Sequence, residues 1–175
     1  MTVVRYRAAP IATIASALAL LSASQLAHAA PATQPGTTQT IILNPLTATT
    51  VQDLDFGQLI PGATAGTVVI NPVNSARTTT GGTLPAGGAP SSAIFVGVAR
   101  PDRMVHLNLP NGSITLTNGT GGTMTVNNFT TDGNINRRTD ANGIIAFRVA
   151  ATLNVAANQP DGAYSGTFNV TLNLQ

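Results

Sequence analysis

Apolar and polar residues alternate along most of this chain, and the alternation predicts β-strands rather than helices. The longest alternating run is Ile144–Val155, in which every odd-numbered residue is apolar. Shorter runs lie at residues 38–43, 46–51, 66–71, 93–99, 104–109, 113–117 and 123–129. Turn-forming Gly, Pro, Asn and Asp residues separate these runs, and we find no helical period after residue 30. About eight to ten short antiparallel strands spaced in this way predict an all-β sandwich.

The end of the chain, residues 163–175, has the most regular alternation. Its apolar parity carries Tyr164, Phe168, Val170, Leu172 and Leu174. The other parity is polar, and the whole segment lacks a charged side chain. Natural edge strands are usually protected by charge, Pro or a bulge, so this strand needs a covering strand from its own molecule or from another one. The turn at 158–162 predicts that this strand forms an antiparallel hairpin with Ile144–Val155.

The first 29 residues have the pattern of a secretory signal peptide. A basic start precedes an apolar, Ala-rich run, and Ala27 and Ala29 form a small-x-small cleavage site. We therefore expect an exported protein that begins near residue 30 and has no membrane span after cleavage. The apolar run is too short for a spanning helix, which needs about 20 apolar residues.

Residues 30–45 precede the predicted sandwich domain, residues 46–175, and contain no charge. Within them, residues 38–43 have strand character, carried by Thr38, Thr40, Ile41, Ile42 and Leu43. One interpretation is an ordinary first strand of the same domain. The other is a strand-prone arm that pairs elsewhere.

The charge balance argues against a nucleic-acid partner. After residue 29 the chain has six Arg and six Asp, with no Lys or Glu, and the arginines are scattered. Cysteine is absent, so the stability of the domain must come from its core and its sheet hydrogen bonds. The low net charge suits a protein that associates with others.

Three irregular stretches interrupt the strand pattern. Residues 74–92 are rich in Ser, Thr, Gly and Pro and predict a long loop. Phe129 switches parity relative to Met124 and Val126, which indicates a bulge. Residues 132–143 are polar and predict a hairpin connection, in which the adjacent Arg137 and Arg138 are expected to be solvated.

Candidate chemistry is sparse. Asp53 and Asp55 share a strand face beside a turn, where carboxylates usually cap the turn. His106 is the single histidine after residue 29 and points away from the apolar face of its strand. Residues 132–143 resemble a calcium loop, but the sixth and twelfth positions lack the required Gly and Glu. The sequence therefore predicts no catalytic residue, no cofactor and no metal site.

Three short motifs in order resemble a family of exported bacterial proteins of unassigned function. They are Leu54-Asp-Phe56-Gly57, Met124-Thr-Val, and the segment from Gly162 to Leu172. This family is similar, in turn, to archaic chaperone–usher pilins and to spore coat protein U domains. The resemblance covers residues 38–175 and implies an immunoglobulin-like sandwich that lacks its final strand.

The resemblance also implies a function. The C-terminal strand would flank an open groove lined by Tyr164, Phe168, Val170, Leu172 and Leu174. A periplasmic chaperone would fill this groove first, and residues 38–43 of another subunit would then replace it, with Ile41 and Leu43, or else Ile42, facing inward. The residues also allow a self-contained monomer, or, as a third class, a carbohydrate-binding module or enzyme. The aromatic side chains fall mostly on inward parities, which argues against the third class.

Overall fold

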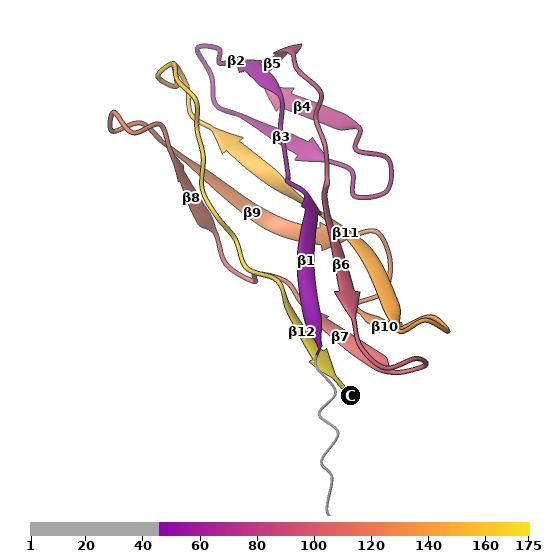
Figure 1. Cartoon of the computed structure of the whole chain (residues 1–175). Helices are drawn as coiled ribbons and strands as arrows, with labels where there is room; N and C mark the ends of the chain where they lie inside the picture. Colours follow the sequence, from indigo (N-terminus) through magenta and orange to yellow (C-terminus); the bar gives the residue numbers. More distant parts are fainter. Residues whose placement is uncertain (1–45) are drawn as a thin grey trace, which may run out of the picture. The chain divides into compact units, whose positions relative to one another are not determined.

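The computed structural model describes residues 46–175, which form twelve strands (Figure 1). The strands are β1 (Thr47–Gln52), β2 (Gln58–Ile60), β3 (Gly66–Ile70), β4 (Arg77–Gly81), β5 (Leu84–Gly87), β6 (Ala93–Val98), β7 (Met104–Asn108), β8 (Ile114–Thr117), β9 (Thr123–Thr131), β10 (Asn136–Arg138), β11 (Ile144–Val155) and β12 (Thr171–Leu174). This part of the chain contains no helix long and apolar enough to cross a membrane.

The larger sheet is organised around β11, the longest strand. The sheet runs in the order β1-β6-β11-β3-β4, and β9 pairs with β11 and then with β8. Val149 faces both Ala93 of β6 and Thr131 of β9, so β6 and β9 lie on opposite edges of β11. Strand β3 occupies the edge opposite β9 in the second half of β11. All of these pairings are antiparallel.

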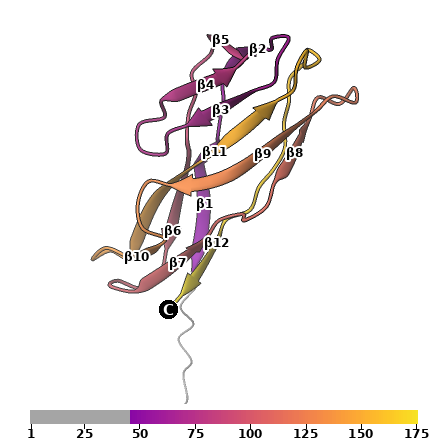
Figure 2. The same cartoon turned by 180° about the vertical axis from the view of Figure 1, so that it is seen from behind.

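A smaller sheet, in the order β10-β7-β12, packs against one end of the larger one (Figure 2). Val105 and Leu107 of β7 lie in one apolar cluster with Phe147 of β11. Leu172 of β12 faces Gly97 of β6, where a Cβ atom would come within 2.8 Å of the leucine side chain. The close approach of the two layers at this end therefore depends on a glycine.

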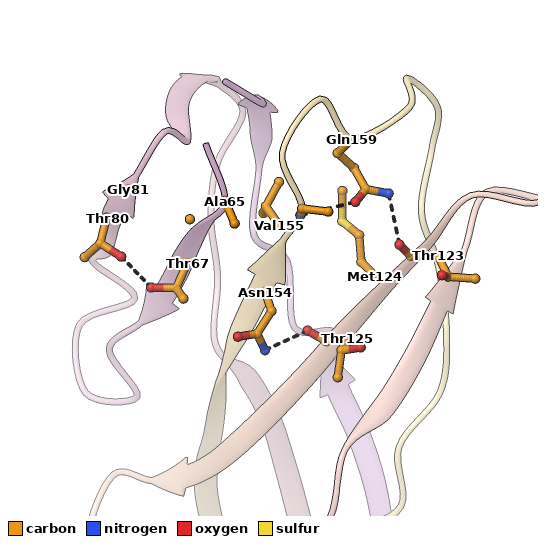
Figure 3. Close-up of a pocket in the computed structure, with 12 residues that line it drawn as sticks. Ala65, Thr67, Thr80, Gly81, Thr123, Met124, Thr125, Asn154, Val155 and Gln159 are labelled. Atoms are coloured by element: carbon orange, nitrogen blue, oxygen red, sulfur yellow. Dashed lines mark hydrogen bonds between the residues drawn. The ribbon is translucent and has the colours of Figure 1, made fainter. Parts of the chain in front are cut away.

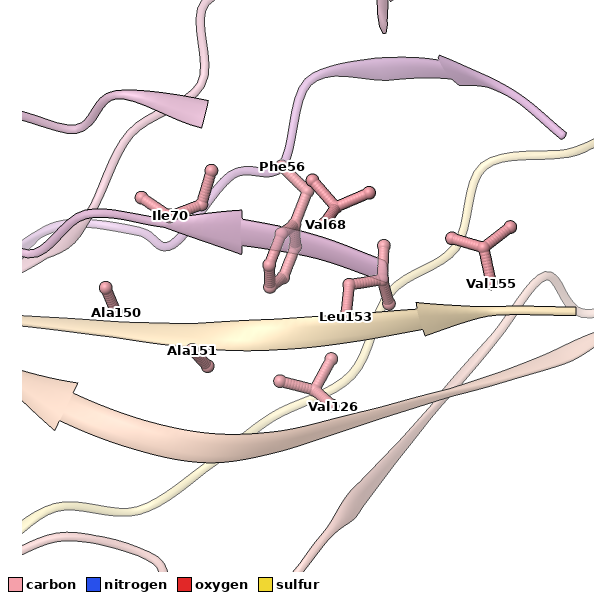
Figure 4. Close-up of a cluster of buried hydrophobic side chains, with 8 residues drawn as sticks. All are labelled: Phe56, Val68, Ile70, Val126, Ala150, Ala151, Leu153 and Val155. Atoms are coloured by element: carbon pink, nitrogen blue, oxygen red, sulfur yellow. The ribbon is translucent and has the colours of Figure 1, made fainter. Parts of the chain in front are cut away.

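The interior consists of two clusters of buried side chains. The covered core, which lies between the two sheets, contains Ala93, Val105, Leu107, Ile145, Phe147 and Val149. The open core, on the far half of the larger sheet, contains Phe56, Val68, Ile70, Val126, Ala150, Ala151, Leu153 and Val155 (Figure 4). Leu54 and Phe129 pack against both clusters and join them.

The predicted fold class is confirmed: the described chain is an all-β, immunoglobulin-like sandwich. Strand β11 has the predicted bounds, and the odd-numbered residues from Ile145 to Val155 are all buried. The strand predicted at 46–51 corresponds to β1, and the one predicted at 66–71 to β3. The number of strands exceeds the predicted range because β2, β4, β5 and β10 are short additions to the predicted set.

The predicted hairpin between Ile144–Val155 and the C-terminal strand is wrong. Strand β12 pairs with β7, and Leu172 lies opposite Leu107. The half of β11 that precedes the turn already has β3 on one edge and β9 on the other. The C-terminal segment therefore crosses to the smaller sheet, and only Thr171–Leu174 of the predicted strand forms a ladder.

The long loop predicted at residues 74–92 is also wrong, because it contains β4 and β5. The β4 ladder places Thr80 opposite Thr67 and Thr78 opposite Val69. β-Branched threonines suit a half-exposed strand, and this preference outweighed the loop signal of the surrounding glycines.

The bulge predicted at Phe129 is confirmed, since the β9–β11 register shifts between Ala150 and Thr152. The polar stretch 132–143 contains the short strand β10 in addition to turns. The expectation that Arg137 is solvated is wrong. Its guanidinium pairs with Asp132 at 2.6 Å, and its side chain is only 18% exposed.

Candidate functional site

The C-terminal segment before β12 is extended but largely unpaired. Ser165 forms one isolated bridge with Thr117 at the end of β8. From Gly166 to Val170 the backbone joins no ladder with any described strand. Backbone N–H and C=O groups in this state need water or another strand as a partner. This segment therefore offers a free edge next to the open core.

The segment from Asp53 to Pro61 lies across from it and is held in place by hydrogen bonds. Asp55 bridges Ser91 through two backbone hydrogen bonds of 2.9 Å. The Arg77 guanidinium donates to the carbonyl oxygens of Phe56 at 2.9 Å and Gln58 at 3.2 Å. Gly57 lies against this guanidinium with φ of +72°, a conformation that favours glycine. The Phe56 ring is thereby fixed over the open core.

A groove with a volume of about 1130 Å³ lies between these two segments. Its walls are residues 53–61 and 159–168. Its floor consists of apolar side chains from β8, β9 and β11: Ile114, Leu116, Met124, Val126, Leu153 and Val155. Four of the eight open-core residues line the groove, whereas only Ala93 of the six covered-core residues does. The groove is therefore an opening in the second layer of the sandwich above the open core, where the partly buried floor side chains Ile114, Leu116 and Met124 reach solvent.

The charges along this groove are all negative. Asp53 and Asp55 lie on one wall and Asp161 on the other, and no cationic side chain lines it. The Asp55 carboxylate accepts a 2.7 Å hydrogen bond from the Gly57 N–H, which fits the turn-capping role expected from the sequence. Within residues 46–175 no group of three or more His, Cys, Asp or Glu side chains could hold a metal ion.

Tyr164 anchors the wall formed by residues 159–168. Its hydroxyl donates to the Pro160 carbonyl oxygen at 2.7 Å and accepts from Gln159 Nε2 at 2.8 Å. Gln159 is buried and also donates to the Thr123 carbonyl oxygen at 2.9 Å. A tyrosine that bonds back to the preceding turn is a hallmark of immunoglobulin-like sandwiches. This network joins the turn after β11 to the start of β9 and holds one end of the groove.

The predicted groove residues fall into two sets. Tyr164 and Phe168 line the groove. Val170 and Leu172 pack against the covered core, and Leu174 is 39% exposed near the chain end. The floor residues were not predicted as part of the site. The alternation of apolar residues could have predicted that these side chains point inward. It could not show that the second layer leaves a gap above them.

Other predicted residues can be placed more briefly. Leu54, Phe56 and Gly57 are on the groove wall. His106 contacts Asn136 of β10 at 2.6 Å on the face opposite Val105. The predicted arm, Thr38–Leu43, and the cleavage site at Ala27 and Ala29 lie outside the described residues.

A second, smaller hollow of about 470 Å³ lies at the end of β11, between β3 and β4 on one side and β9 on the other (Figure 3). Four of its six polar side chains, those of Thr67, Thr80, Asn154 and Gln159, bond within the protein. Thr67 and Thr80 share a hydrogen bond of 2.6 Å, and Asn154 donates to the Thr125 carbonyl oxygen at 3.1 Å. Because most of its polar side chains are paired and it is smaller, this hollow is a weaker candidate than the groove.

No curated protein and no solved structure matches this chain. A family model described as a domain of unknown function, DUF4402, matches residues 46–174, which is most of the chain and nearly all of the described sandwich. The chain therefore belongs to the DUF4402 family of domains of unknown function.

Proposed function

We propose that this protein is an exported, pilin-like structural subunit that assembles by β-strand addition. The observation that carries the proposal is the groove, where an apolar floor and the unpaired backbone of residues 166–170 lie side by side. Strand addition uses these two features together. The free edge supplies main-chain hydrogen bonds, and the floor supplies pockets for alternate side chains.

The proposed occupant is the segment Thr38–Leu43 of a second copy. It is uncharged, and one of its parities carries Ile41 and Leu43 while the other carries Ile42. Burying each apolar side chain stabilises the complex by about 1.5–3 kcal/mol. The two apolar side chains of the Ile41 and Leu43 parity, or Ile42 on the other, act together with a backbone ladder to offset the cost of ordering the segment. Before assembly, a strand from a periplasmic chaperone is the occupant that the exported location suggests.

The sequence between this segment and β1 disfavours a tight hairpin of the segment with β1 of its own chain. Only Asn44, Pro45 and Leu46 separate Leu43 from Thr47. A tight two-residue reversal needs a positive φ at its first central residue. Proline excludes positive φ at its own position and biases the residue before it toward extended conformations. The segment is therefore poorly suited to folding back alongside β1 of its own chain.

The test compares the exported chain, residues 30–175, with a form that lacks residues 30–43. We expect the longer form to assemble in a concentration-dependent way and the shorter form to be monomeric by light scattering. A synthetic peptide of residues 37–44 should bind the shorter form and raise its melting temperature. A peptide with Asp at positions 41 and 43 should not bind, and one with Asp at 42 separates the two parities.

The alternative is a self-contained, monomeric exported sandwich. It predicts that both forms have the same size at all concentrations and that the peptide has no effect. Identical oligomers from both forms would contradict strand addition through Thr38–Leu43.

A further inference from the structure

The charged residues of the described chain are separated in space. Asp53, Asp55 and Asp161 line the groove, and Arg77 lies behind one wall, so this region carries a net charge of −2. The remaining five Arg and three Asp, which lie outside the groove lining, carry +2. The described part of the chain is neutral as a whole, but its charge is polarised.

The unbalanced positive charge is most exposed in the turn between β6 and β7. Arg100 and Arg103 flank Asp102 there, and Asp102 is paired with Arg138 at 2.9 Å. Within residues 46–175, Arg100 and Arg103 form no ion pair, and both are exposed. We call this turn, residues 100–103, the basic turn.

The basic turn is next to the place where the predicted arm enters the domain. Thr47, the first residue of β1, pairs with Val98, two residues before Arg100 (Figure 1). The described chain thus begins beside the basic turn, whereas the groove that would receive the arm is acidic.

We infer that the basic turn of one copy docks against the acidic groove rim of the next copy, so that charge complementarity orders head-to-tail assembly. This inference rests on the proposed strand addition. If Leu43 lies in a partner's groove, three residues separate it from Thr47, a span of about 13–14 Å for an extended chain. That span keeps the basic turn near the partner's groove. It exceeds the Debye length of about 8–10 Å at moderate salt but lies within the length of about 30 Å at 0.01 M salt, so the attraction acts at low salt. The occupant of the rim is therefore a second copy of this chain.

The expected effect is mainly on the rate of association. Exposed ion pairs contribute little to equilibrium stability, but complementary potentials raise association rates about 10- to 1000-fold at low salt. The same charges disfavour groove-to-groove contacts between copies, because both rims are negative.

The test exchanges the charges on the exported chain, residues 30–175. One variant carries R100E and R103E, a second carries D53R and D161R, and a third carries all four changes. None of these four side chains makes a hydrogen bond or ion pair within the described residues, so circular dichroism and thermal unfolding should show intact folds. R100Q with R103Q, and D53N with D161N, provide neutral versions.

At low salt we expect each reversal to slow assembly about tenfold or more and the fourfold variant to return to near the wild-type rate. The neutral versions should slow assembly less, and the differences should disappear in high salt. Failure of the fourfold variant to recover, or a wild-type rate independent of salt, would overturn the inference.

A separate variant distinguishes this outcome from failure of strand addition. I41D with I42D and L43D, which removes the apolar side chains of both parities, should abolish assembly at every salt concentration if strand addition is correct. If that variant still assembles, the proposed function fails. If it does not assemble and the charge exchange shows no recovery, strand addition stands and the charge inference fails.

Discussion

The covered core and the open core are built from the same strand but meet different surroundings. The first half of β11 contributes Phe147, which stacks on Phe95 at 5.4 Å and lies beneath β7 and β12. The second half contributes Leu153 and Val155, which form part of the groove floor. Within the sheet, β6 pairs with the first half and β3 with the second, so both halves have neighbouring strands and the main difference is in the second layer.

The contrast shows where this domain is complete and where it depends on a partner. In the covered core, Phe168 bridges layers by packing edge-on to Phe95 at 6.0 Å and against Phe129 at 5.2 Å. In the open core, a stretch of chain without a ladder covers the equivalent face. A mutation in the covered core should therefore act on the isolated domain, and one in the groove floor should act on its complex.

The largest expected effect comes from a matched pair of leucines. Leu107→Ala removes a side chain that is 1% exposed and should lower the free energy of unfolding by about 2–5 kcal/mol. Leu116→Ala removes a partly buried groove-floor side chain and should cost about 1 kcal/mol. Urea unfolding of the form lacking residues 30–43 measures both.

Binding of the peptide of residues 37–44 should give the reverse order. Leu116→Ala should weaken binding about fivefold, equivalent to about 1 kcal/mol, whereas Leu107→Ala should leave the affinity unchanged. If Leu107→Ala and Leu116→Ala lowered the free energy of unfolding equally and left equal affinities for the peptide, the two cores would not differ in the way described.

An intermediate effect is expected at the groove wall. Tyr164→Phe leaves the Pro160 carbonyl oxygen and the buried Gln159 amide without their partner and should lower the free energy of unfolding by about 1–3 kcal/mol. Thermal unfolding measures the loss. Thr167→Val serves as the control, since this exposed hydroxyl makes no hydrogen bond within the described chain, and it should change stability by less than about 0.5 kcal/mol. A Tyr164→Phe variant as stable as the control would show that the network does not hold this wall.

The smallest effect concerns two Asp–Arg pairs outside the groove. Burial raises the pKa of Asp132. Hydrogen bonds with Arg137, the Arg148 backbone and Thr131, together with the positive charge of Arg137, lower it by more than burial raises it. The pKa of Asp132 therefore lies below its ordinary value of 3.8. The ionised form therefore stabilises the fold above pH 3.8, and this contribution is lost as the pH falls through the lowered pKa. Asp132→Asn should cost about 1–2 kcal/mol at pH 7 and progressively less in acid.

Asp102→Asn is the matched control for that pair. The Asp102 side chain is 78% exposed and its partner Arg138 is 55% exposed, so the change should cost less than about 0.5 kcal/mol. Urea unfolding at pH 7 and below pH 3.8 separates the two pairs. A loss at Asp132 that is independent of pH would show that its carboxylate charge is not the source of the stabilisation.

Much of the local structure was predictable from the sequence. A period of two assigns each residue of a strand to a face, and the predicted inward residues of β11 are the buried ones. The parity switch at Phe129 marked the bulge, and the parity of Tyr164 and Phe168 was correct. These features depend on neighbouring residues and on backbone sterics, which a single stretch of sequence contains.

Strand pairing was decided only by the tertiary structure. Period two identifies the face of a strand but not its neighbour, so the sequence alone placed the C-terminal strand beside β11 instead of β7. The groove, too, is decided by the tertiary structure. Its floor comes from β8, β9 and β11, and its two walls come from residues more than ninety positions apart in the sequence. The alternation in residues 163–175 showed that this segment needs a partner. Strands β3 and β9 occupy both edges of the second half of β11, and residues 166–170 remain without a ladder beside the groove.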